Sequence, residues 1–254
     1  MISAGIDVGA KTIKVVLLKD RKIQSKSLIL AGIDMAGSTK QALNEALDEA
    51  KLSFQDIDIV VSTGAGRKEV SFAKKELTSV SADAKGIVFL LPSVRTVVDV
   101  GAEESRAIRC DASGRVTNFA INEKCAAGAG VFAEAMARAL GVNLEEFSKL
   151  ALKSDKTNLL NTQCVIFAES EVVSLIHAGT SKEDISRVVH NTLARRISSM
   201  VRAIRLEKDI ALIGGMAKNV GFIDSLSRDL QVTPVVPAEP EYVSAIGAAL
   251  FGVT

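Results

Sequence analysis

The chain has 254 residues, 48% of them hydrophobic, and is long enough to bury a sizeable core in one large domain or two small ones. A net charge of +1, no Trp and one Tyr exclude the basic, aromatic surface typical of nucleic-acid-binding proteins. The absence of a long uncharged apolar run argues against a membrane span, and three cysteines without an export signal predict a reducing, cytoplasmic compartment.

Two copies of the tetrapeptide Asp-Val-Gly-Ala begin at Asp7 and Asp99, an offset of 92 residues. Each copy lies between two short apolar runs, which predicts a strand, a glycine turn and a second strand. Backbone N–H groups in such a turn form an anion-binding concavity, and the adjacent aspartate can hold a hydrated divalent cation. The pair predicts phosphate binding between two similar lobes, residues 1–92 and 93–254. The alternative is two ordinary hairpins that share a tetrapeptide by chance.

The remaining elements follow from apolar spacing and turn residues. Before the second hairpin we expect a strand at 23–30, a helix at 38–51, a strand at 57–63 and a helix at 81–90. After it we expect a strand at 116–121, helices at 131–140, 143–152, 169–177 and 182–206, strands at 210–213 and 232–236, and a closing helix at 242–251. The loop 64–67 is either part of a cleft wall or a plain connection, and the pattern leaves both open.

Two of the three cysteines lie at predicted helix starts. Cys125 follows Lys124 within the unusual small-residue stretch 122–130, a setting that favours a thiolate, and Cys164 also precedes a helix. No CxxC pair exists, so a cluster that needs four thiolates requires two chains. Buried, inert cysteines are the ordinary alternative. Cys110 is expected to be a strand residue.

The two hairpins resemble the phosphate loops of the actin, heat-shock ATPase and sugar-kinase superfamily, and residues 210–219 resemble its adenosine loop. The resemblance implies an α/β fold of the actin, hexokinase and heat-shock ATPase (ribonuclease H-like) type, with two lobes around a cleft for ATP or ADP and Mg²⁺. The implied nucleotide-binding residues are Gly9, Ala10, Lys11, Thr12, Gly101, Ala102, Gly214, Gly215 and Asn219.

Three further side chains belong to these hairpins. Asp7 is the expected Mg²⁺-side carboxylate, acting through water. Glu103 either orients the attacking water or is a rim carboxylate, and Lys14 either reaches phosphate or is a plain solvated strand lysine. Elsewhere in the chain, His177 and His190 are isolated, and both are interpreted as structural or surface residues.

The cysteine segments narrow the resemblance to one branch of the superfamily. Lys-Cys-Ala-Ala-Gly around Cys125, and Phe-Ala-Glu-Ser-Glu after Cys164, are similar to segments of the ATP-dependent activators of 2-hydroxyacyl-CoA dehydratases and the ATPase subunits of benzoyl-CoA reductase. The resemblance implies that each subunit gives Cys125 and Cys164 to one [4Fe-4S] cluster at the interface of a dimer, formed with itself or with a paralogous subunit. It also implies ATP-driven electron transfer to a CoA-thioester reductase or dehydratase component.

One departure concerns the partner enzyme. Dehydratase activators usually carry Gly-Gly-Gln-Asp in the second phosphate loop, where this chain has Gly-Ala-Glu-Glu at 101–104. The change favours the benzoyl-CoA reductase side, where this loop is more varied. A small-molecule (sugar-type) kinase of the same fold is the alternative function, although the sequence offers no clear general base for it. A non-catalytic actin-like scaffold is a third interpretation, and iron content separates the first from both.

Overall fold

The computed structural model describes residues 1–122, 130–161 and 164–253. Its contacts divide the chain into two compact units, each with an apolar core of its own. The first comprises Met1–Val97, Arg109–Asn118 and Pro237–Thr254, and the second comprises Val98–Ile108 and Phe119–Val236. The units therefore differ from the expected lobes 1–92 and 93–254 chiefly because the C-terminal segment returns to pack on the first strands.

The first unit is built on a five-stranded sheet with the order β3-β2-β1-β4-β5. Its strands are β1 (Ile2–Val8), β2 (Thr12–Lys19), β3 (Lys22–Leu30), β4 (Ile59–Thr63) and β5 (Lys75–Glu76). β1 pairs antiparallel with β2 and parallel with β4. The carboxyl ends of β1 and β4 therefore lie side by side, which brings the hairpin turn beside the loop that follows β4.

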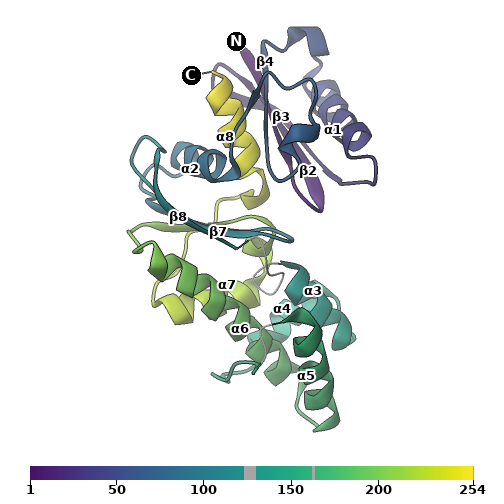
Figure 1. Cartoon of the computed structure of the whole chain (residues 1–254), viewed down its shortest axis with the longest axis vertical. Coiled ribbons are helices and arrows are strands. Elements are labelled where there is room, and N and C mark those ends of the chain that lie inside the picture. Colours follow the sequence, from purple (N-terminus) through teal and green to yellow (C-terminus); the bar gives the residue numbers. More distant parts are fainter. Residues whose placement is uncertain (123–129, 162–163, 254) are drawn as a thin grey trace. The chain divides into compact units, whose positions relative to one another are not determined.

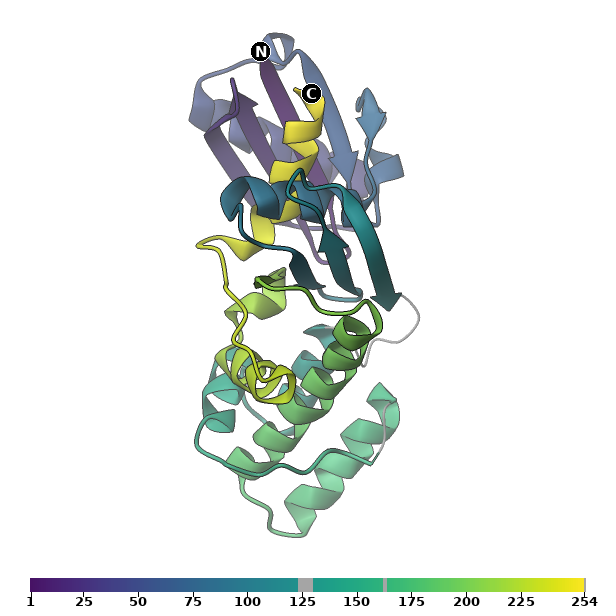
Figure 2. The same ribbon diagram turned by 90° about the vertical axis from the view of Figure 1, so that its left-hand side faces the viewer.

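Helices cover both faces of this sheet. α1 (Met35–Ala50) packs on one face through a row of buried residues that includes Ala42 and Leu43. α8 (Val243–Gly252) packs on the other face and on α2 (Ser79–Leu90). Figure 2 shows α8, in yellow, running along the strands. An added Cβ at Gly247 would lie within 3.0 Å of the Ala82 backbone, so small residues permit this close packing, as expected for the closing helix.

The second unit repeats the strand order of the first in its four-stranded sheet, β8-β7-β6-β9. The strands are β6 (Thr96–Val100), β7 (Ser105–Cys110), β8 (Val116–Asn122) and β9 (Ile210–Ile213). Its helices gather on one face of the sheet (Figure 1) around one apolar core. They are α3 (Gly130–Ala139), α4 (Leu144–Ala151), α5 (Val165–His177), α6 (Lys182–Ala203) and α7 (Val220–Leu230).

Two predicted elements differ most from those of the structure. The helix expected at 169–177 begins earlier, at Val165, so that Cys164 is its N-cap residue. The strand expected at 232–236 is reduced to a single parallel bridge between Ala211 and Val235, because the adjacent Pro234 and Pro237 lack the N–H groups that a longer ladder needs. Among the described residues, no helix has both the length and the apolar character that crossing a membrane requires.

Candidate functional site

The first hairpin places a lysine directly on the motif aspartate. The amide of Gly9 donates to the carbonyl of Thr12 over 3.0 Å and closes the turn. Asp7 and Lys14 are register partners, so their side chains share one face of the sheet. Lys14 Nζ lies 3.0 Å from Asp7 Oδ2, and the two side chains are 13% and 11% exposed. The interpretation of Lys14 as a solvated strand lysine is therefore wrong.

The tip of this turn is open to solvent. Ala10 and Lys11 are exposed, and Thr12 is half-buried at the start of β2. Phosphate binding by these residues stays a prediction, and the position of Asp7 and Lys14 directly beneath the turn is compatible with it.

The second hairpin repeats the arrangement with an arginine. The amide of Gly101 donates to the carbonyl of Glu104 over 2.9 Å, as Gly9 does to Thr12. The guanidinium of Arg106, seven residues after Asp99 as Lys14 is after Asp7, contacts the carboxylates of both Asp99 and Glu104. Sequence reasoning singled out Asp99 through the repeated tetrapeptide but missed Arg106, although Arg106 occupies the position that Lys14 has in the first hairpin. Glu103 is exposed on the same turn, and its role with water stays a prediction.

A glycine with positive φ lies against each motif aspartate. Gly64 follows β4 with φ of +92°, and an added Cβ there would lie 2.5 Å from Asp7 Oδ1. Gly214 follows β9 with φ of +82°, and an added Cβ would lie within 3.0 Å of Asp99 Oδ1. Only glycine fits either place, because a side chain would be strained by φ and would collide with the carboxylate. The duplication thus extends from the hairpins to the loops after β4 and β9.

The predicted adenosine loop leads into a capped helix. Gly215 has open space beside it, since an added Cβ would meet nothing within 4 Å. Asn219 is 5% exposed, and its Oδ1 accepts a hydrogen bond from the Phe222 amide over 2.8 Å, which caps α7. Its role in nucleotide binding stays a prediction.

His190 lies behind this loop in α6. It is fully buried, and its ring centroid lies 4.8 Å from that of Phe147, with 35° between the ring planes. Its Nδ1 lies 2.7 Å from the Ser186 carbonyl oxygen. Burial lowers the pKa of His190 to about 4, and the nearby Arg187 guanidinium adds to the effect. His190 is thus structural, and His177 lies exposed at the end of α5, as expected for both.

Two of the three cysteines lie among the described residues. Cys125 lies outside the described residues. Cys164 is exposed at the N-terminus of α5, and its side chain makes no capping hydrogen bond. Cys110 is buried in β7 with its sulfur 3.9 Å from the Arg95 carbonyl, as expected for a strand residue. Within the described ranges, no group of three or more His, Cys, Asp or Glu side chains could hold a metal ion.

The second hairpin is bonded directly to the helix that follows the Cys125 segment. The amide of Gly130 donates to the carbonyl of Gly101 over 2.8 Å, and the amide of Val131 donates to that of Ala102 over 2.9 Å. The first turn of α3 is thereby attached to the phosphate turn. α3 also packs on α5, the helix that begins after Cys164.

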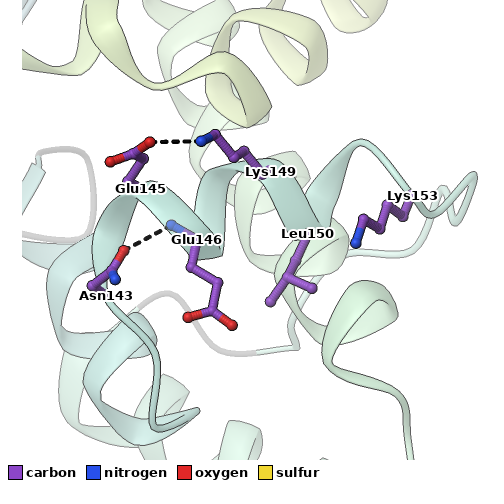
Figure 3. Close-up of a pocket in the computed structure, with 6 residues that line it drawn as sticks. All are labelled: Asn143, Glu145, Glu146, Lys149, Leu150 and Lys153. Atoms are coloured by element: carbon purple, nitrogen blue, oxygen red, sulfur yellow. Dashed lines mark hydrogen bonds and ion pairs between the residues drawn. The ribbon is translucent and has the colours of Figure 1, made fainter.

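A surface hollow of about 390 Å³ lies along α4 (Figure 3). Its polar groups already serve the helix: Lys149 Nζ binds Glu145 Oε1 at 2.6 Å, and Asn143 Oδ1 accepts from the Glu146 amide at 2.8 Å. Leu150 and Lys153 complete the lining. Among the described residues, none of those predicted for nucleotide or cluster binding lines this hollow.

Comparison with known proteins gives one consistent family. The model of the BadF/BadG/BcrA/BcrD ATPase family matches residues 4–252. The activator of lactoyl-CoA dehydratase from Anaerotignum propionicum is 38% identical over 99% of this chain and 97% of its own length. One of the subunits of benzoyl-CoA reductase from Thauera aromatica is 31% identical over 99% of this chain and 93% of its own.

Solved structures agree with the fold. Component A of (R)-2-hydroxyglutaryl-CoA dehydratase from Acidaminococcus fermentans is 34% identical, with a TM-score of 0.94 over 99% of this chain and 97% of its own. The 2-hydroxyisocaproyl-CoA dehydratase activator from Clostridium difficile with bound ADPNP is 33% identical, with a TM-score of 0.92 over 99% and 94%. A ROK family glucokinase from Streptomyces griseus, 12% identical with a TM-score of 0.60 over 99% of each chain, shares the fold alone. The expected actin- and hexokinase-like fold is confirmed.

Proposed function

Because the chain belongs to the BadF/BadG/BcrA/BcrD ATPase family, we propose that it is an ATP-hydrolysing iron–sulfur electron donor to an enzyme that acts on CoA thioesters. Family membership confirms the expectation of an ATPase. The observation that carries the electron-transfer part is Cys164, an exposed thiol at the start of a helix that also exposes Ile166 and Phe167.

The nucleotide part of the proposal rests on the two hairpins and the loop after β9. Asp7 and Asp99 are buried carboxylates, each paired with one cation, and a carboxylate has further lone pairs for water in a cation's shell. The turn residues Gly9–Thr12 and Gly101–Ala102 would bind phosphate, and Gly214 with Gly215 would lie beneath the base. When bound, Mg²⁺ neutralises phosphate charge, and Glu103 is proposed to orient the attacking water.

The cluster part rests on two cysteines per chain. The Cys164 sulfur is accessible and is not used for capping, which fits a thiolate ligand. Cys125 is the proposed second ligand, so a [4Fe-4S] cluster needs the same pair from a second chain. Bound there, the cluster supplies one-electron transfer at low potential.

Two exposed apolar side chains at the start of α5 support a dimer interface beside Cys164. Ile166 is 72% exposed and Phe167 64% exposed, immediately after Cys164. Exposed apolar side chains beside one another are typical of an interaction surface. A second subunit on this face would cover them and bring its own cysteines close.

The acceptor is proposed to be a CoA-ester dehydratase, with a benzoyl-CoA reductase-type enzyme as the alternative. Identity is 38% with the lactoyl-CoA dehydratase activator and 31% with the reductase subunit. The higher identity favours a dehydratase, whereas Glu103 and Glu104 in the second phosphate loop favoured the reductase. The sugar-type kinase is the weaker function, because its support is a shared fold at 12% identity.

Iron content tests the cluster assignment. We expect anaerobically purified wild-type protein to contain about four irons per dimer, and we expect Cys164→Ser to lose iron. Cys110→Ser is the matched control, because this cysteine is buried and remote from a helix start. A Cys164→Ser protein with full iron content and unchanged electron transfer would show that the ligand assignment is wrong.

Dimerisation is tested separately by charge on the α5 face. Phe167→Glu should shift the protein to monomer in sedimentation, because a buried, unpaired carboxylate opposes association. Leu152→Glu is the control, since Leu152 is 49% exposed at the end of α4. Unchanged sedimentation of Phe167→Glu would place the interface elsewhere.

A further inference from the structure

The loop after β4, residues 64–67, forms one surface with the first hairpin turn. The amide of Gly66 donates to the carbonyl of Val8 over 2.9 Å, one residue before the turn glycine. Gly64 packs on the same carbonyl and on the carboxylate of Asp7. Whatever approaches Asp7 from the turn therefore also approaches this loop.

The construction of the loop matches that of the proposed nucleotide loop in the other unit. Gly64 contacts Asp7 and the Val8 carbonyl, as Gly214 contacts Asp99 and the Val100 carbonyl, and both glycines have positive φ. A short 3₁₀ helix follows in each case, at Arg67–Glu69 and Gly215–Lys218. The loop after β4 is thus the internal counterpart of a loop already proposed to bind nucleotide.

The residue that precedes the loop has an unfinished hydrogen-bond requirement. Thr63 is the register partner of Asp7 in the parallel pair, so their side chains share a face. The Thr63 hydroxyl is completely buried and has no hydrogen-bond partner in the structure. A buried hydroxyl without a hydrogen-bond partner costs about 1–3 kcal/mol, so a group that bonded to it at this end of the sheet would be stabilising.

Arg67 is the cation that this loop contributes. Its Nη1 donates to the Gly64 carbonyl over 3.1 Å, and its Nε lies 3.7 Å from Glu76 Oε2. The side chain is 32% exposed, and Glu76 lies on β5, the neighbour of β4 in the sheet. One hydrogen bond and one long ion pair hold it loosely, and exchanging them for a phosphate contact is energetically feasible.

We propose that residues 64–67 are a third phosphate-binding element, in which Arg67 binds the terminal phosphate of a nucleoside triphosphate. The inference rests on the proposed nucleotide site. Lys14 already pairs with Asp7 at 3.0 Å, whereas Arg67 is held by one hydrogen bond to a carbonyl and by a longer ion pair of 3.7 Å, so its charge can turn to a ligand. A divalent cation held on the Asp7 side would neutralise part of the phosphate charge, and the planar guanidinium of Arg67 can bind two oxygens of the terminal phosphate.

The test compares two nucleotides that differ in the terminal phosphate. Dissociation constants of Mg²⁺–ADP and of Mg²⁺–ADPNP are measured by calorimetry for the wild-type protein, Arg67→Gln and Arg67→Met. We expect both variants to bind ADPNP about 10- to 100-fold more weakly, the effect of losing a charge-assisted hydrogen bond of about 1.5–3 kcal/mol, and ADP nearly as the wild type does. Arg95→Gln is the matched control, because Arg95 also binds backbone carbonyls, of Pro92 and Val94, without touching the loop or the turn.

The outcomes separate the inference from the proposed function. Wild-type protein that binds neither nucleotide contradicts the proposed nucleotide site. Wild-type binding with an unchanged preference in a folded Arg67 variant overturns the role of Arg67. An equal loss of ADP and ADPNP also overturns it, since Arg67 would then only support the loop. Thermal unfolding without nucleotide shows which variant is folded, and Met retains the aliphatic stem of arginine in case Gln does not.

Discussion

Lys14 Nζ lies 3.0 Å from Asp7 Oδ2 at the base of the first hairpin, and neither side chain is more than 13% exposed. Arg106 holds Asp99 in the same way in the second hairpin. In each hairpin, the basic residue therefore neutralises the negative charge of the motif aspartate. This charge would otherwise repel a phosphate group bound at the turn. The pairing is internal to each hairpin, so it exists before any ligand binds.

Lys14→Met should destabilise the protein by about 3 kcal/mol, because it leaves the Asp7 carboxylate buried without its cation. Urea unfolding in the absence of nucleotide measures this. Lys19→Met, at the exposed end of the same strand, is the control and should change stability by less than about 0.5 kcal/mol. Equal stabilities of the two variants would mean that the pair contributes nothing to the hairpin.

Gly64→Ala should lower the free energy of unfolding by more than the strain of a positive φ alone would. Gly141 has φ of +68° and open space around it, so Gly141→Ala measures the conformational strain, about 1–2 kcal/mol. Gly64→Ala adds a collision with the Asp7 carboxylate and the Val8 carbonyl. We expect lower thermal stability and weaker nucleotide binding than for Gly141→Ala, and indistinguishable variants would contradict the packing of this loop on Asp7.

His190 should make the protein sensitive to acid. The unfolded chain protonates this imidazole near its ordinary pKa of 6.5, whereas burial lowers the pKa in the folded protein to about 4. The unfolded state therefore binds the proton first, and stability falls as the pH drops from 6.5 to 4, on the order of 3 kcal/mol in total.

Urea unfolding across this pH range, with wild-type and His190→Gln proteins, tests the contribution. The variant should be less stable at pH 7, and its stability should depend less steeply on pH between 6.5 and 4. His177→Gln keeps His190 and should keep the wild-type slope. The same slope in all three proteins would assign acid sensitivity to other groups.

Nucleotide state should alter access to the proposed cluster. The carbonyls of Gly101 and Ala102 bind the first amides of α3, directly after the Cys125 segment. A turn that responds to phosphate therefore moves the start of this helix, and such coupling is typically 1–3 kcal/mol. Under anaerobic conditions, an iron chelator should remove iron at different rates with ATP and with ADP. Equal rates with both nucleotides shown to be bound would mean that hairpin and cluster do not communicate.

The duplicated Asp-Val-Gly-Ala was sufficient to predict two strand–turn–strand hairpins, because a short apolar run on each side of a glycine turn has few alternatives. The fold class followed from the resemblance of these hairpins to the phosphate loops of a known superfamily, and the positions of nearly all helices followed from apolar spacing. The predicted start of α5 was four residues too late. The residue at the true N-cap position is Cys164, and cysteine is not among the residues that usually cap a helix. The prediction of a strand at 232–236 was wrong because the prolines within and beside this segment outweigh the β propensity of its valines.

The candidate site was determined only in part by the sequence. Local pattern singled out Asp7 and the turn glycines as candidates, because they belong to a contiguous motif, and the family resemblance singled out Cys164. It did not identify the contact of Gly64 with Asp7, nor that of Gly214 with Asp99, which join residues far apart in the chain. Those contacts follow from parallel pairing, in which a strand from elsewhere in the chain ends beside the hairpin. The sequence left open whether Lys14 reaches phosphate or solvent, and only the register of the two strands shows that it lies opposite Asp7, where it is 13% exposed and has a carboxylate partner.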